Sequence, residues 1–158
     1  MKHFLPPHQP QPLDHPGLRQ LANFRYQLRK FLRFSERAAR SNGLTPQQHQ
    51  LLLGIAGYTG QGWATITELA EFLQERHNAV VGLVQRAERC GLVRKEQSTS
   101  DHRFVRVSLL PKGERILAKL TDLHEREVRR CQLGILNASG SHAFTTRKNS
   151  KKNSSNGP

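Results

Sequence analysis

The feature that most constrains the fold is a pair of short helical segments followed directly by two alternating strands, all within residues 67–109. Thr67 precedes the apolar-patterned run ELAEFLQE, and after a break near Arg76 apolar residues recur at helical spacing until Gly91. A glycine is the usual residue just beyond a helix end, and two short helices joined by a tight turn form a helix-turn-helix. We therefore predict a helix-turn-helix over about 67–91, with Thr67 capping its first helix and no glycine in its turn.

The two strands predict a small hairpin, or wing. Residues 92–95 and 104–109 alternate between apolar and polar side chains, which is the pattern of half-buried strands, and the residues between them are polar. We place the wing at about 92–109 and expect a further, very short strand at 64–66.

Helical patterns flank this unit on both sides. Residues 17–41 and 111–132 carry amphipathic patterns, and Thr45 with Gln48 forms a capping-box pattern that starts a helix expected to reach Gly57. The predicted fold is mainly α with a small antiparallel β-hairpin, a winged helix-turn-helix domain spanning 17–132. Residues 1–16 are predicted to be a disordered proline-rich leader and 133–158 a disordered, polar, basic tail.

The charge favours a polyanionic partner. The chain has 25 Lys+Arg against 12 Asp+Glu, a net charge of +13, which points first to nucleic acid. No apolar run is long enough to span a membrane and no signal peptide is apparent, so we expect a cytoplasmic protein. No Ser/His/Asp set, phosphate loop or metal-ligand spacing appears, so we expect no enzyme, no cofactor and no metal site.

Several side chains have the chemistry to contact DNA. Asn and Gln can pair with adenine and Arg with guanine in the major groove, while Arg103 at the wing tip, held by Asp101, suits a narrow minor groove. The predicted DNA-binding residues are His77, Asn78, Ala79, Val81, Gln85, Arg86, Arg94, Lys95, Asp101, His102, Arg103 and Arg106. Three simpler interpretations stay open: Asn78 only caps its helix, Gln85 is only solvated, and Arg86 contacts phosphate.

Three stretches resemble a known family. They are GLTPQQHQLLL (43–53), VVGLVQRAERCGLV (80–93), and the DHR motif at 101–103 followed by LLPKG (109–113). On these, residues 18–130 resemble the multiple antibiotic resistance regulator (MarR) family of bacterial winged-helix transcription factors. The resemblance implies a homodimer on a pseudo-palindromic operator, usually repressing and often released by a small aromatic ligand or by cysteine oxidation.

The resemblance also assigns the flanking helices, 17–41 and 111–132, to dimerisation. The predicted interface residues are Leu18, Leu21, Leu28, Phe31, Ile116, Leu120 and Leu123. Leu110 stands where the family usually has a capping threonine, and the polar sequence after Cys131 replaces an expected final helix, so we expect a weaker dimer than in relatives.

Two rival functions remain open. They are a non-specific basic nucleic-acid binder and an interaction module that forms inactive mixed dimers; Arg103→Ala should abolish binding only in a sequence-reading protein.

The cysteines and aromatic residues carry further expectations. We expect Cys90 to be a buried apolar residue and Cys131 to be easier to expose. Aromatic residues that could line a pocket for a small aromatic effector are Tyr58, Trp63, Phe72, Phe24 and Phe31.

Overall fold

The computed structural model describes residues 15–97 and 105–140. The elements in chain order are α1 (Pro16–Ser41), α2 (Pro46–Leu53), a π-helical turn (Gly54–Tyr58), β1 (Trp63–Thr65), α3 (Ile66–Leu73), α4 (His77–Arg89), β2 (Val93–Gln97), β3 (Val105–Leu109) and α5 (Pro111–Gly140). This order confirms the predicted fold class, a mainly helical winged helix-turn-helix. Most of the predicted leader, the last part of the predicted tail, and the wing-tip residues Asp101, His102 and Arg103 lie outside the described residues.

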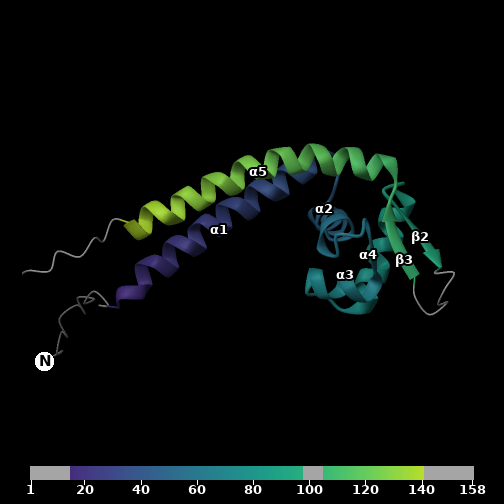
Figure 1. Cartoon of the computed structure of the whole chain (residues 1–158), viewed down its shortest axis with the longest axis horizontal. Coiled ribbons are helices and arrows are strands. Elements are labelled where there is room, and N and C mark those ends of the chain that lie inside the picture. The colour runs from purple at the N-terminus through teal and green to yellow at the C-terminus, as the bar shows by residue number, and fades with distance from the viewer. Residues whose placement is uncertain (1–14, 98–104, 141–158) are drawn as a thin grey trace, which may run out of the picture.

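Two long helices extend from a compact unit (Figure 1). We call residues 46–109, from α2 to β3, the head, and α1 together with residues 124–140 of α5 the arm. In the arm the two helices run side by side in opposite directions, so that the start of α1 and the end of α5 lie together, far from the head. The first half of α5 lies on the head itself.

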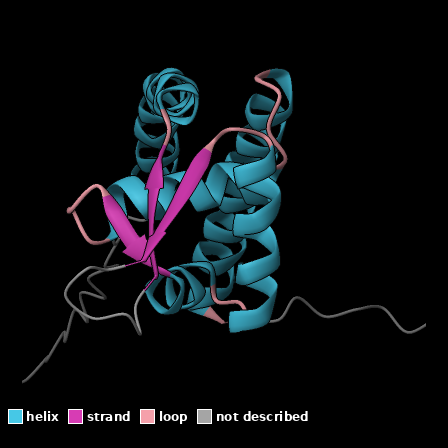
Figure 2. Cartoon of the chain, turned by 90° about the vertical axis from the view of Figure 1, so that its right-hand side faces the viewer, coloured by secondary structure: helices cyan, strands magenta, loops and turns pink. Residues whose placement is uncertain are grey.

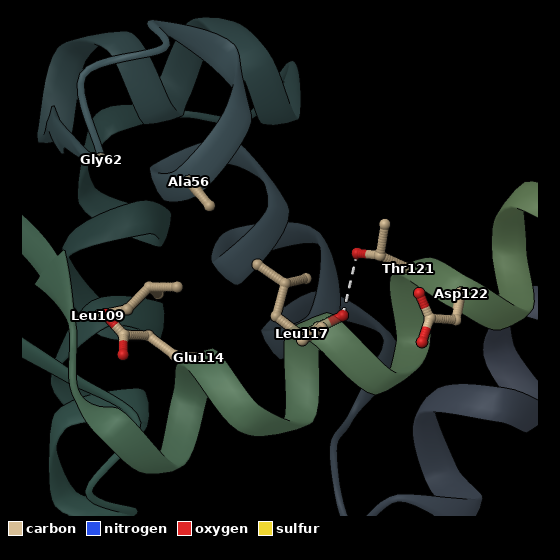
Figure 3. A pocket seen from close by; sticks show the side chains of 8 residues that line it. Ala56, Gly62, Leu109, Glu114, Leu117, Thr121 and Asp122 are labelled. Carbon is tan, nitrogen blue, oxygen red and sulfur yellow. Dashed lines mark hydrogen bonds between the residues drawn. The ribbon is translucent and has the colours of Figure 1, made fainter.

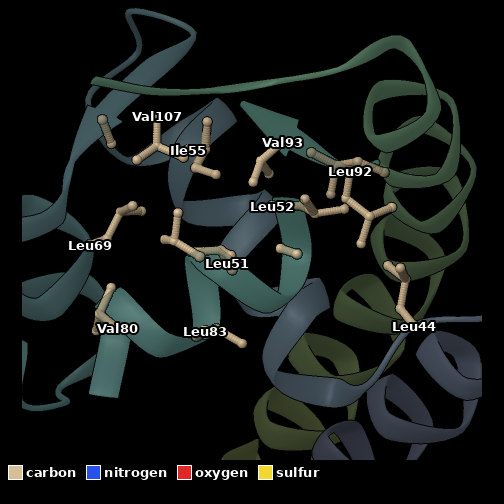
Figure 4. Packing of buried hydrophobic residues seen from close by; sticks show 14 of the residues in the cluster. Leu44, Leu51, Leu52, Ile55, Leu69, Val80, Leu83, Leu92, Val93 and Val107 are labelled. Atoms are coloured by element: carbon tan, nitrogen blue, oxygen red, sulfur yellow. The ribbon is translucent and has the colours of Figure 1, made fainter. Parts of the chain in front are cut away.

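The core of the head joins every head element to α5 (Figure 4). Its fully buried large side chains are Leu51, Leu52, Ile55, Leu69, Leu92, Leu120, Val80, Val84, Val93 and Val107. Burial of such side chains is the main stabilising contribution, at about 1.5–3 kcal/mol for each. The core therefore fixes the relative positions of the helix pair, the wing and α5.

Capping boxes define the starts of α2 and α3. In α2 the prediction is confirmed: the Gln48 N–H donates to Thr45 Oγ1 at 3.1 Å and the Thr45 N–H donates to Gln48 Oε1 at 2.9 Å. In α3 the predicted cap, Thr67, is wrong, because the box is formed by Thr65 and Glu68, with the Thr65 N–H donating to Glu68 Oε2 at 2.7 Å. A box needs an acid or amide three positions after the cap, and only Thr65 meets that condition.

The turn between α3 and α4 is made without glycine, as the sequence predicts. Gln74 adopts the left-handed conformation, with φ of 54°, and its side-chain amide donates to the Glu71 carbonyl at 2.7 Å. A non-glycine residue in this conformation costs about 1 kcal/mol. Arg76 is the N-cap residue of α4, so Asn78 lies inside the helix and the interpretation of Asn78 as only a cap is wrong.

The three strands form one antiparallel sheet in the order β1-β3-β2 (Figure 2). Trp63 of β1 pairs with Ser108 of β3, and Val93 of β2 pairs with Leu109. The short strand before α3 is thus present, at Trp63–Thr65, and it anchors the wing to the base of the helix pair.

Helix α5 is longer than its sequence pattern suggests. It continues to Gly140, so the predicted end near residue 132 is too early and part of the predicted tail is helical. Residues 133–140 include Leu133, Leu136 and Ala138, which favour helix, whereas Gly134 costs only about 1 kcal/mol. Polar composition was a weaker guide than helix propensity in this segment.

The start of α5 is fastened to the turn between α4 and β2. The Leu110 N–H donates to the Leu92 carbonyl at 2.9 Å, and Lys112 Nζ donates to the Cys90 carbonyl at 2.9 Å. Gly113 is buried against the same turn, where a Cβ atom would collide with the Leu92 carbonyl oxygen. These contacts fix the direction in which α5 leaves the head.

Two histidines meet where α1, α2 and α5 join. His124 Nδ1 lies 2.7 Å from the Leu120 carbonyl oxygen, so it donates, and Nε2 lies 2.9 Å from Ser35 Oγ. The His49 ring is 4.7 Å from that of His124, only 4% of His49 is exposed, and its Nδ1 is buried without a hydrogen-bond partner among the described residues. Burial, followed by the proximity of His124, lowers the pKa of His49 to about 4.

Candidate nucleic-acid interface

Helix α4 presents one face to the core and another to solvent. Val80, Leu83, Val84 and Ala87 are buried, as expected for positions three and four apart. The predicted DNA-binding residues of this helix lie on the remaining surface: His77, Asn78, Ala79, Gln85 and Arg86 are exposed and Val81 is half-buried. We call these six residues the recognition face.

Arg86 extends along the recognition face toward the start of α4. One of its guanidinium nitrogens lies 3.3 Å from the position that a Cβ atom would occupy at Gly82. Glycine at that position gives the guanidinium room to lie flat on the helix. Arg86 has no ion-pair partner among the described residues, which leaves its donors free for a ligand.

The basic residues of the wing strands have partners within the chain. Arg94 Nε lies 3.1 Å from Glu96 Oε1 and 3.1 Å from Ser108 Oγ, and Lys95 Nζ lies 3.0 Å from Glu88 Oε2. Such exposed pairs contribute about 0–1 kcal/mol, so a phosphate can compete for these cations. The acidic partners were missed in the sequence, although Glu96 stands two positions from Arg94 on the same strand face.

Arg106 stacks on an aromatic ring at the base of the wing. Its guanidinium carbon lies 4.4 Å from the centre of the Trp63 ring. Trp63 pairs with Ser108, so Arg106 is its diagonal neighbour across the two strands, within reach of a long side chain. The stack holds a predicted DNA-binding cation in one place and was not anticipated from the sequence.

A groove of about 320 Å³ lies between α3, the start of α4 and the wing. The lining residues are Thr65, Ile66, Thr67, His77, Val81, Lys95 and Val105. The structure thus brings His77 and Val81 of the recognition face together with Lys95 of the wing.

The predicted interface residues fall into two groups. Leu18, Leu21 and Leu28 are 40%, 55% and 43% exposed on α1, and Phe31 is half-buried. Leu120 is 0% exposed in the core of the head, so its assignment to a subunit interface is wrong, because its side of α5 faces the core elements of its own chain. Ile116 and Leu123 are partly buried against the same core.

The arm also exposes apolar residues that the sequence prediction omitted. Phe24, Tyr26 and Leu32 of α1 are 48%, 57% and 47% exposed, and Val128 of α5 is 39% exposed. A small apolar cavity of about 170 Å³ lies among Phe24, Leu28, Phe31 and Val128, with Cys131 at its edge. In the sequence, the available signal was the spacing of Phe24 three positions after Leu21 and of Leu32 four positions after Leu28.

The cysteines differ from expectation. Cys90 is exposed rather than buried, because it lies at the end of α4 beyond the buried stripe, where Gln48 contacts its sulfur at 3.7 Å. Cys131 is half-buried against α1, with its sulfur 3.9 Å from the Gln27 carbonyl oxygen. Burial, with a smaller contribution from Glu127, raises the pKa of the Cys131 thiol.

A cavity of about 450 Å³ lies between α5 and part of the head (Figure 3). Glu114, Leu117, Thr121 and Asp122 of α5 lie on one side, and Ala56, Gly62 and Leu109 lie on the other; Thr121 Oγ1 donates to the Leu117 carbonyl at 2.9 Å. The aromatic residues predicted to surround a ligand do not line this cavity.

Within 15–97 and 105–140 no group of three or more histidine, cysteine or acidic side chains is placed to hold a metal ion. In the same ranges no helix is long and apolar enough to cross a bilayer.

Comparison with known proteins supports the resemblance predicted from the sequence. Residues 42–103, which begin directly after α1, match the sequence model of the MarR family. No curated protein sequence matches the chain.

Solved structures of other proteins, MarR-family members among them, share the fold. AbsC, a MarR family transcriptional regulator from Streptomyces coelicolor, is 21% identical with a TM-score of 0.64, covering 78% of this chain and 83% of its own. A MarR family protein from Bacillus stearothermophilus is 27% identical with a TM-score of 0.54, covering 71% and 79%. A mutant of MepR from S. aureus, bound to an oligodeoxyribonucleotide, is 18% identical with a TM-score of 0.58, covering 75% and 96%.

Proposed function

From the premise that residues 42–103 carry the MarR-family pattern within a MarR-like winged-helix fold, we propose that the protein is a transcriptional regulator that reads double-stranded DNA as a homodimer. The role that we assign to it is binding and involves no catalytic step. The operator is expected to be pseudo-palindromic, because a two-fold dimer presents two identical recognition helices.

The observation that carries the proposal is the recognition face of α4. Asn78, Gln85 and Arg86 are exposed on one side of a helix whose other side is fixed in the core. These side chains have the donors and acceptors that read adenine and guanine in the major groove. The net charge of +13 supports a polyanionic partner.

The exposed apolar surface of the arm supports the dimer. Leu18, Leu21, Phe24 and Leu28 repeat along α1 at helical spacing, each at least 40% exposed. A row of large apolar side chains on an exposed helix face favours burial against another copy. The helical continuation of α5 to Gly140 lengthens the arm beyond the sequence prediction, which makes a stable dimer more favourable than the sequence suggested.

Repression and effector release are the finer parts of the proposal. A dimer bound over a promoter blocks access to it, so repression is the sign that we propose. The cavity between α5 and the head is where we place a small effector, because a ligand there would contact Leu117 of α5 and Leu109 of β3 together. Fluorescence titration with small aromatic acids, followed by release of DNA, is the test of this part.

The primary experiment is selection of bound sequences from a random duplex library at about 150 mM salt, where non-specific attraction is weakened. We expect an enriched motif with two-fold symmetry and half-sites about one helical turn, roughly 34 Å, apart. Absence of enrichment, with binding that disappears as salt rises, would favour the non-specific basic binder instead.

Two arginine variants separate sequence reading from charge. Arg86→Ala and Arg129→Ala each remove one positive charge, the first from the recognition face and the second from the arm, where Arg129 pairs with Glu125 at 3.4 Å. We expect Arg86→Ala to weaken the binding free energy for the selected site by about 1–3 kcal/mol and to remove the base preference at one position of the motif. Arg129→Ala should leave the motif unchanged, and equal effects of both variants would contradict the proposal.

A further inference from the structure

Part of the groove between α3, α4 and the wing is lined by apolar side chains, which cannot read bases through hydrogen bonds. Ile66 and Val81 are half-buried and Val105 is 37% exposed, so each keeps part of its apolar surface open to the groove. None of these three side chains can donate or accept a hydrogen bond.

Val81 is the member of this group that lies on the recognition face. It follows Asn78 by three positions and precedes Gln85 by four, so the three side chains form one row along α4. A DNA segment whose bases meet Asn78 and Gln85 would therefore also meet Val81, which lies between them on the helix. The apolar groove is continuous with the surface that the proposed function assigns to DNA.

The surroundings of the groove suit a polyanion. Lys95 and His77 also line it, and no acidic side chain is among its described lining residues. Lys95 is held by Glu88 at 3.0 Å, which keeps its ammonium group beside the groove.

Only one chemical group on the major-groove edge of DNA matches an apolar concavity. The base edges present donors and acceptors, except for the methyl group at C5 of thymine. We propose that the groove bounded by Ile66, Val81 and Val105 is a subsite for a pyrimidine C5-methyl group, supplied by thymine in unmodified DNA. This inference rests on the proposed function and adds the specificity of one position in each half-site.

The test uses the full chain and the duplex selected above. Each thymine of the motif is replaced by deoxyuridine, which removes only the methyl group, and affinity is measured by fluorescence anisotropy. We expect one position per half-site at which the replacement lowers affinity about threefold to tenfold, as for loss of one well-buried methyl contact. At that position 5-methylcytosine should bind better than cytosine by a similar factor.

Two variants assign the effect to the groove. In Val81→Ala the wall of the groove is removed while helix propensity is retained, so the penalty for deoxyuridine should shrink to less than about twofold. Gln85→Ala, on the same row but outside the groove, should lower affinity for both duplexes and leave the penalty in place.

The outcomes separate the two proposals. A selected motif in which no deoxyuridine replacement changes affinity more than about twofold, or in which the penalty survives in Val81→Ala, would overturn the methyl subsite and leave the regulator standing. Failure to select any motif would overturn the proposed function and the subsite with it.

Discussion

The buried histidine at the junction of α1, α2 and α5 makes folding stability depend on pH in a defined window. His49 has a pKa of about 4 in the folded chain, against about 6.5 in an unfolded chain. Between these values the unfolded chain binds a proton that the folded chain does not, so unfolding becomes more favourable as pH falls. Above about pH 6.5 both states carry neutral His49, and its contribution no longer changes.

The magnitude of this effect follows from the two pKa values. Over the full window between them the free energy of unfolding falls by about 3 kcal/mol, and between pH 7.5 and pH 5.0 it falls by about 2 kcal/mol. The cause is structural: a protonated His49 would place a charge in a site that is 4% exposed, next to the ring of His124 and with no partner for Nδ1 among the described residues.

Urea denaturation at pH 7.5 and pH 5.0, at one fixed protein concentration, measures this loss. The parent protein and the variant His49→Gln are compared, because glutamine keeps polarity without titrating. We expect the free energy of unfolding of the parent to fall by about 2 kcal/mol more than that of His49→Gln between the two pH values. His77→Gln, which removes an exposed histidine, serves as the control and should behave like the parent. An equal loss in the parent and His49→Gln would refute the reasoning.

Three further predictions concern stability and assembly. Gly113→Ala should lower the free energy of unfolding by about 1–3 kcal/mol, because the new methyl group collides with the carbonyl at the α4–β2 turn, whereas Gly57→Ala, which meets nothing within 4 Å, should have little effect in the same thermal melts. Thr65→Ala should cost about 1 kcal/mol by urea denaturation through loss of the α3 capping box, and Thr67→Ala much less; the reverse order would contradict the assignment of the cap. Leu21→Lys, at a side chain 55% exposed on the arm, should weaken self-association in sedimentation equilibrium while leaving the head folded by circular dichroism; an unchanged association constant would contradict the proposed dimer contact.

Local patterns in the sequence were sufficient to predict the secondary structure that positions the candidate site. The helix pair, the wing and the capping box at Thr45 each depend on residues close together in the chain, and each was predicted. The cap of α3 was misplaced because two threonines compete and only Thr65 has Glu68 at the required spacing. The end of α5 was misplaced because polar composition outweighed helix propensity in the interpretation.

Properties that depend on the tertiary structure were harder to predict from the sequence. Leu120 and Leu21 both belong to apolar stripes, yet Leu120 is buried in the head and Leu21 is exposed, and sequence spacing does not distinguish them. The cross-strand partners of the wing cations, Trp63 under Arg106 and Ser108 beside Arg94, come from strand register, which the sequence does not state.

Helix α5 contributes to both the head and the arm, and its two halves should therefore tolerate substitutions differently. Its first half closes the core of the head through Leu117 and Leu120, and its second half lies in the arm. Substitutions in the first half therefore affect the folding of the head, whereas substitutions in the second half affect the packing of the arm and, through it, the proposed dimer. Sequence drift should accordingly be slow before residue 124 and faster beyond it. For the same reason a head cut away from α5 would expose its own core, so the head cannot be transplanted as a separate module.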